Sequence, residues 1–147
     1  MVKSISHPCF FLIIFLGTMV SFSCARSIQA HYIPKDEIHP ETARIYILRP
    51  SPSVYGVKQE IYENNFIVGQ LGPRGYIVWD TKAGAIILDG PWGFVKVMAE
   101  QGKTYYFKLH PKTFSAGRSS FFITAITEKE GKATISKLKK PQVNVID

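Results

Sequence analysis

The chain is poor in cysteine and histidine, and each shortage excludes a class of site. Cys9 and Cys24 are the two cysteines among 147 residues, and Cys9 lies in an apolar run near the N-terminus that we expect to be removed from the mature chain. Without that run the chain holds at most one cysteine, so it can form no intrachain disulfide. Of the remaining histidines, His31, His39 and His110, none stands in a recognised nucleophile motif. We therefore expect no catalytic residue, no metal ligand and no cofactor.

A long apolar run is also missing. The run Cys9–Val20 is little more than half of the roughly 20 apolar residues that a membrane-spanning helix needs. Lys3 precedes it, and the small or polar residues Ser21, Ser23, Cys24 and Ala25 follow it, which is the order of an export signal. This order predicts a signal over residues 1–24 and a protein that works outside the bacterial cytoplasm, with a retained anchor as the weaker alternative.

The end of the signal allows two cleavage sites. Ser21-Phe22-Ser23-Cys24 resembles a bacterial lipobox, in which the cysteine becomes the lipid-bearing first residue, so Cys24 is the candidate lipidation site. The alternative is a small-x-small site, Ser23-Cys24-Ala25, with cleavage before Arg26. The first cut predicts a protein anchored in the cell envelope, at the outer membrane or the periplasmic face. The second predicts a free periplasmic or secreted protein.

The net charge is +7, and it falls by one when Lys3 is removed with the signal. Basic residues are scattered along the chain, and the dense group is Lys137, Lys139 and Lys140. A solvated face explains such a group, and attraction to an anionic membrane or cell-wall polymer is the other interpretation.

Beyond the signal we expect a tether over 25–42, one β-domain over 43–139 and a C-terminal tail over 140–147. A tether, or alternatively a loosely docked arm, is expected because Pro34, Pro40 and several charges interrupt any regular pattern there. The β-domain is expected because short runs rich in Tyr, Phe, Ile and Val alternate with turn residues, as in a sandwich or barrel. The expected strands are 43–49, 57–63, 66–71, 76–80, 85–88, 94–99, 104–109 and 120–126.

Three local signals refine this pattern. Asn64-Asn65 suits a tight two-residue hairpin turn, because Asn tolerates positive φ better than any residue but Gly. A longer loop is expected over 110–118. Thr127, with Glu130 three residues on, forms a capping-box pattern and predicts a short helix that ends before Pro141. Gly131 inside that helix lowers its propensity by about 1 kcal/mol, so a final strand remains the alternative.

Four segments in this order resemble a known family. They are ARIYILRPS, EIYENNFIVGQLGPRGYIVWDTKAG, EQGKTYYFKL and EKEGKATISKLKK, between about Ala43 and Lys139. Together they resemble a bacterial lipoprotein family of no established activity, itself similar to the PEGA-type β-domains of cell-envelope proteins. The hairpin positions that carry the resemblance are Ile61, Tyr62, Asn64, Gly69 and Leu71. The resemblance implies a mainly β, prealbumin-like antiparallel β-sandwich on an envelope-anchored protein, and it implies no chemistry.

Two loops are candidate surfaces for binding a partner. Trp92 stands between Gly and Pro residues, where an exposed indole would stack on a sugar or anchor a protein, although it could also fold back over a sheet end. Phe114 and Arg118 in the following long loop are the second candidate. Aromatic residues next to Lys108 could suggest nucleic-acid binding, but export argues against nucleic acid as a partner.

The sequence therefore predicts a noncatalytic cell-envelope lipoprotein module that binds or supports other components. Its predicted partners are the lipid bilayer, through a lipid on Cys24, and an envelope protein or glycan. The alternative function is a free periplasmic or secreted protein that binds carbohydrate or protein through the Trp92 loop.

Overall fold

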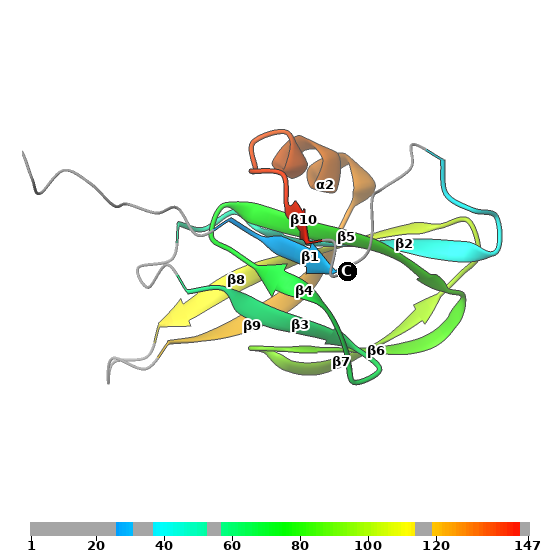
Figure 1. Cartoon of the computed structure of the whole chain (residues 1–147), viewed down its shortest axis with the longest axis horizontal. Coiled ribbons are helices and arrows are strands. Elements are labelled where there is room, and N and C mark those ends of the chain that lie inside the picture. Colours follow the sequence, from blue (N-terminus) through cyan, green and yellow to red (C-terminus); the bar gives the residue numbers. More distant parts are fainter. Residues whose placement is uncertain (1–25, 31–36, 53–56, 114–118, 145–147) are drawn as a thin grey trace, which may run out of the picture.

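The computed structural model describes residues 26–30, 37–52, 57–113 and 119–144, and these form two sheets and one helix (Figure 1). The described residues contain ten strands and the helix α2. Their bounds are β1 Ile28–Ala30, β2 Thr42–Arg49, β3 Gln59–Glu63, β4 Phe66–Leu71, β5 Gly75–Lys82, β6 Gly84–Gly90, β7 Gly93–Ala99, β8 Thr104–Thr113, β9 Ser119–Ile126, α2 Glu128–Ile135 and β10 Gln142–Asn144.

The two sheets have different strand orders. One has six strands in the order β10-β1-β4-β3-β6-β7, and the other has four in the order β5-β2-β8-β9. Most neighbours are antiparallel, while β1 pairs with β10 and β2 with β8 in parallel. The prediction of a mainly β sandwich with a short C-terminal helix is confirmed.

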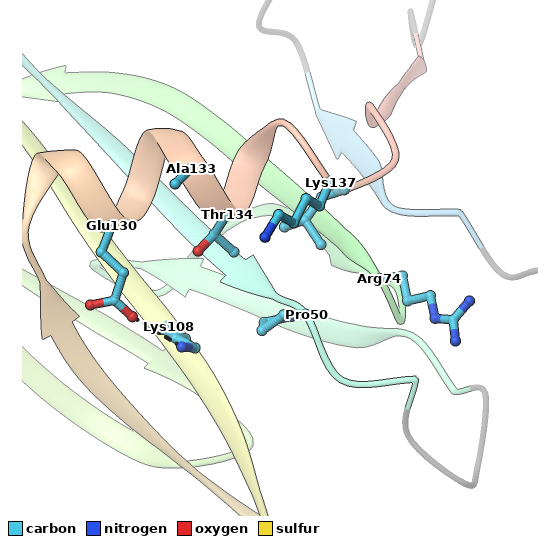
Figure 2. Close-up of a pocket in the computed structure, with 8 residues that line it drawn as sticks. Pro50, Arg74, Lys108, Glu130, Ala133, Thr134 and Lys137 are labelled. Carbon is cyan, nitrogen blue, oxygen red and sulfur yellow. Dashed lines mark hydrogen bonds and ion pairs between the residues drawn. The ribbon is translucent and has the colours of Figure 1, made fainter.

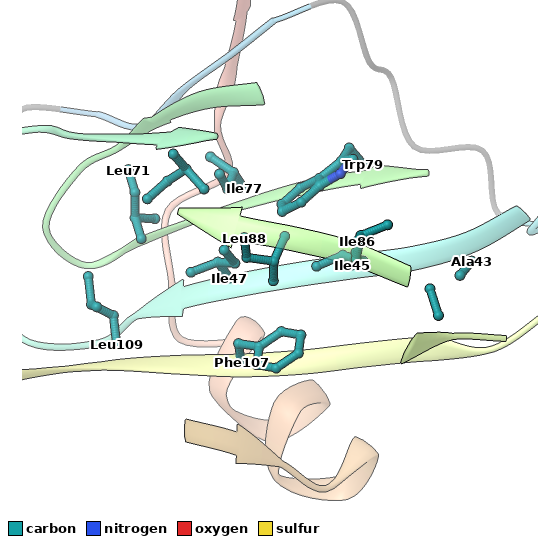
Figure 3. Close-up of a cluster of buried hydrophobic side chains, with 12 residues drawn as sticks. Ala43, Ile45, Ile47, Leu71, Ile77, Trp79, Ile86, Leu88, Phe107 and Leu109 are labelled. Atoms are coloured by element: carbon teal, nitrogen blue, oxygen red, sulfur yellow. The ribbon is translucent and has the colours of Figure 1, made fainter. Parts of the chain in front are cut away.

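The main core lies between the two sheets. Its buried side chains come from alternate positions of each strand, as expected where one face of a strand is covered. Figure 3 shows Ile45, Ile47 and Phe107 of the four-stranded sheet beside Ile86 and Leu88 of the six-stranded sheet. The same cluster also contains Ala43, Ile61, Leu71, Ile77, Trp79, Ala99 and Leu109.

A second, smaller core lies under α2, on the outer face of the four-stranded sheet. Leu48, Tyr76 and Val78 are buried there, and Ile135 and Leu138 pack against them. Strands β2 and β5 are therefore covered on both faces. This explains why the four consecutive residues YIVW of β5 are all apolar and all buried.

Helix α2 begins where its capping signal predicts. Thr127 is the N-cap, and its hydroxyl accepts a hydrogen bond from the Glu130 backbone N–H at 3.3 Å. Gly131, which lowers helix propensity, is the buried residue of the helix and lies against Tyr106 of β8. A Cβ atom at this position would lie 2.3 Å from Tyr106 Cδ1, so glycine is what lets the helix lie this close to the sheet.

The hairpin prediction is confirmed, and the long loop is shorter than predicted. Asn64 and Asn65 both have positive φ, 48° and 71°, and join β3 to β4.

Strand β8 continues to Thr113, where the sequence suggested a loop from His110 onward. Proline is tolerated at position 111 because β2 pairs with β8 only as far as Lys108, so no neighbour on that side needs the missing N–H.

The predicted tether over 25–42 and tail over 140–147 are wrong for part of their length. Residues 28–30 form β1, which pairs with β4 on one side and with β10 of the supposed tail on the other. Three-residue strands show no measurable alternation, so the sequence pattern gave no sign of them. The first strand of the domain therefore begins at Ile28, and Thr42 already belongs to β2.

Polar side chains fix β1 in place. Ser27 and Gln29 are fully buried. The Ser27 hydroxyl accepts a hydrogen bond from the Gly72 N–H at 2.9 Å, and Gln29 Oε1 accepts one from the Val78 N–H at 3.0 Å. The second bond links β1 of one sheet to β5 of the other, so it closes one edge of the sandwich.

Within the described residues, no helix is long and apolar enough to cross a membrane.

Candidate functional site

An open groove of about 560 Å³ lies between α2 and the four-stranded sheet, and we call it the basic groove. The helix side contributes Thr134 and Lys137, and the sheet side contributes Lys108 of β8 (Figure 2). The turn between β4 and β5 adds Arg74. The full lining is Pro50, Arg74, Lys108, Glu130, Ala133, Thr134, Lys137 and Leu138.

The groove carries an excess of positive charge. Lys108 Nζ forms an ion pair with Glu130 Oε1 at 3.0 Å, shown by the dashed line in Figure 2. Arg74 and Lys137 are exposed, and among the described residues neither forms an ion pair. The groove can therefore attract an anionic group, with the Thr134 hydroxyl as a hydrogen-bond donor. Its lining contains no cysteine or histidine.

The lysines near position 137 form a dense group in the sequence, but the sequence does not connect that group with Arg74 or Lys108. Arg74 has a positive φ of 52° in the turn after β4, and the backbone carbonyl of Arg74 accepts a hydrogen bond from the Lys139 N–H at 2.8 Å. This contact brings residues 72–75 beside the segment after α2. No local pattern in the sequence indicates such a long-range contact.

Trp92 does not present an exposed indole. It lies in the turn between β6 and β7, is half-buried, and packs against the main core. A Cβ atom on Gly90 would lie 2.7 Å from the Trp92 ring, so Gly90 provides the space in which the ring folds back. The interpretation in which Trp92 folds back over a sheet end describes this position, while binding through its loop stays a prediction.

The other predicted site residues, Cys24, Phe114 and Arg118, lie outside the described residues. The histidines that the structure describes are His39, which is exposed, and His110 of β8. The His110 ring stacks on Phe122 at 4.7 Å between centroids, and Nε2 lies 3.0 Å from Thr124 Oγ1. Burial, followed by the charge of Lys108, lowers the pKa of His110 from its ordinary value. In the described ranges, no three His, Cys, Asp or Glu side chains gather as metal ligands would.

A buried arginine, Arg49, holds one end of the sandwich together. Arg49 is 1% exposed, donates hydrogen bonds to the carbonyls of Val57 and Leu71 at 2.7 and 3.1 Å, and lies over the Phe121 ring. Its pKa is lowered by burial. Arg49 therefore fastens the end of β2 to the six-stranded sheet and to the chain after residue 56.

Glu63 links the sheets at another point. Its carboxylate, on β3, accepts hydrogen bonds from Trp79 Nε1 at 2.5 Å and from the Thr81 hydroxyl, both on β5. The two oxygens of one side chain thus satisfy two donors of the opposite sheet. This pairing explains a polar residue at the end of an otherwise apolar interface.

Comparison of the chain with models of protein families, with curated proteins and with solved structures finds no match.

Proposed function

We propose that this protein is a noncatalytic module of the bacterial cell envelope, held at a membrane by a lipid on Cys24. The resemblance to envelope lipoproteins is part of this proposal, as is the export signal over residues 1–24. The observation that carries the proposal is the position of β1. This strand begins so soon after Cys24 that a lipid on Cys24 would hold the folded domain close to the membrane.

The chain from Cys24 to the first buried side chain is very short. Ser27, three positions later, is fully buried and hydrogen-bonded to Gly72. Three extended residues reach at most about 10 Å, so a lipidated Cys24 would hold the sandwich directly against the bilayer. A tether of 18 residues, as first expected over 25–42, would have reached roughly 60 Å. A lipid at this position therefore suits a module that acts at the membrane surface.

Metabolic labelling tests this proposal. Cells that express the full-length chain are grown with a palmitate analogue, and label on the protein is compared between the unchanged chain and Cys24→Ala. We expect label on the unchanged chain and none on Cys24→Ala. The matched control is Cys9→Ala, which removes the other cysteine and should keep the label. An unlabelled unchanged chain, or equal label in both variants, would contradict the anchor.

The mass of the mature N-terminal peptide provides an independent measurement. A lipid-modified peptide that begins with Cys24 is the expected result. An unmodified peptide that begins with Arg26 would show that the alternative cleavage is used and that the protein is free in the periplasm or medium.

A further inference from the structure

Three segments that are distant in the sequence meet where β1 begins. The Gln142 N–H donates a hydrogen bond to the Ser27 carbonyl at 2.9 Å, and the Gly72 N–H donates one to the Ser27 hydroxyl. Lys139 forms an isolated parallel bridge with Gly75. Residue 27, the turn 72–75 and the segment 139–142 are therefore next to one another.

These segments and the residues next to them carry five basic residues, which we call the basic collar: Arg26, Arg74, Lys137, Lys139 and Lys140. Lys139 is half-buried and the other four are exposed. The stretches 26–30, 64–79 and 131–144 contain no aspartate or glutamate. Glu130, the acidic residue of the adjoining groove, pairs with Lys108. Among the described residues, no carboxylate forms an ion pair with any member of the collar.

The segments that carry the collar lie beside the point at which a lipid-bearing N-terminus would leave the domain. The reach from Ser27 back to Cys24 is at most about 10 Å, close to the screening length of about 8 Å at physiological ionic strength. An anchor at Cys24 would therefore keep the collar inside the field of a charged bilayer. Like charges that lie together repel one another, and a negatively charged surface would relieve that repulsion.

We propose that the basic collar binds the anionic phospholipid headgroups of the membrane that holds the protein. The inference rests on the proposed lipid on Cys24, which would keep the collar close to the bilayer. Binding of the collar would then determine which end of the sandwich faces the membrane. Acyl chains and a basic patch can act together in membrane binding, because the patch adds electrostatic attraction to anionic lipids.

Vesicle binding by the full-length Cys24→Ala chain, purified as cells process it, tests the collar without the lipid. The probes are vesicles of phosphatidylcholine alone and of phosphatidylcholine with phosphatidylglycerol, and the readout is co-sedimentation at low and high salt. We expect binding to the anionic vesicles alone, and we expect high salt to abolish it. Substituting Lys137→Gln, Lys139→Gln and Lys140→Gln together should weaken binding about a hundredfold, since each charge near an anionic surface contributes about fivefold.

The matched control has the same net charge and places the substitutions elsewhere: Lys82→Gln, Lys96→Gln and Lys129→Gln, all at exposed positions. It should bind like the Cys24→Ala chain. Equal weakening in both triple variants would overturn the proposal, because net charge alone would then explain binding. Should the collar variant fail to fold by circular dichroism, the single change Lys140→Glu at an exposed position replaces it, with Lys96→Glu as its control.

Two further outcomes separate the possible explanations. Binding of soluble polyphosphate without binding of anionic vesicles would assign the collar to a wall polymer and overturn the membrane proposal. The vesicle test uses a chain that cannot be lipidated, so its failure counts against the collar alone. Failure of palmitate labelling counts against the anchor at Cys24 alone.

Discussion

The substitution Gly131→Ala distinguishes a helix that merely caps the domain from one that packs tightly on it. In an exposed helix, alanine stabilises relative to glycine by about 1 kcal/mol. In this protein the added methyl would lie 2.3 Å from Tyr106 Cδ1 and 2.5 Å from Cγ, where ordinary contact begins near 3.4 Å. These atoms lie at the end of the ring that is attached to Cβ, so a small movement of the hydroxyl end of Tyr106 would not relieve the contact.

Two responses are open to the structure, and both cost stability. Helix α2 can move away from the sheet, which loosens the packing of Ile135 and Leu138 on the second core. Alternatively, Tyr106 can rotate and lose its stacking on Tyr46, whose ring centroid lies 5.0 Å away. Overpacking of this kind costs about 1–3 kcal/mol. With a cost near the upper limit and the gain in propensity subtracted, we expect Gly131→Ala to lower the free energy of unfolding by about 2 kcal/mol.

Urea unfolding of the Cys24→Ala chain, followed by circular dichroism, measures this change. Ala133→Gly is the control, because Ala133 is exposed on the same helix and should lose about 1 kcal/mol through propensity alone. In a Tyr106→Ala background the obstructing ring is gone, and Gly131→Ala should then stabilise. If Gly131→Ala stabilises the chain that retains Tyr106, the close packing of α2 on β8 is refuted.

Three further predictions concern the links between the sheets and the response to pH. Gln29→Ala leaves a buried N–H of β5 without its acceptor and should lower the unfolding free energy by about 1–3 kcal/mol in urea; no loss would refute the role of Gln29 in closing that edge. Glu63→Ala should destabilise by a similar amount of about 1–3 kcal/mol and red-shift Trp79 fluorescence, whereas Glu63→Gln, which still offers an acceptor, should lose less. Burial raises the pKa of Tyr76 and Tyr106 above the ordinary value of 10.0, and the neighbouring Tyr46 raises both further. The contribution of these two hydroxyls to the free energy of unfolding is therefore complete below pH 10.0 and is lost as pH rises through the folded-state pKa. Unfolding free energy measured against pH should fall on that alkaline side, and a flat profile there would contradict the burial of both hydroxyls.

Elements whose signals are local could be predicted from the sequence. Asn64 and Asn65 specify the hairpin because the required positive φ is a property of the residues themselves. Thr127 specifies the helix start because its hydroxyl reaches a backbone N–H three positions away. In both cases the residues that determine the structure lie within a few positions of one another in the sequence.

Features that depend on distant partners could not be predicted in this way. Strand β1 exists because Gln142 and Gly69 lie on either side of it, and neither neighbour is indicated by residues 28–30. Gly131 counts against a helix until Tyr106 is known to lie beneath it. The basic groove and the collar likewise depend on the contact between Arg74 and Lys139, two residues from different parts of the chain.

The parallel pairing of β1 with β10 means that β1 gains one of its two neighbours only after residues 142–144 have been made. Strand β1 is made first and β10 last, and residues of the first are hydrogen-bonded to residues of the second. A chain that enters its compartment N-terminus first would hold β1 with one edge open until residues 142–144 arrive. Under the export proposed above, β1 would gain its second neighbour only after residues 142–144 have crossed the membrane, so the strand that begins close to Cys24 in the sequence would be among the last to be fully paired.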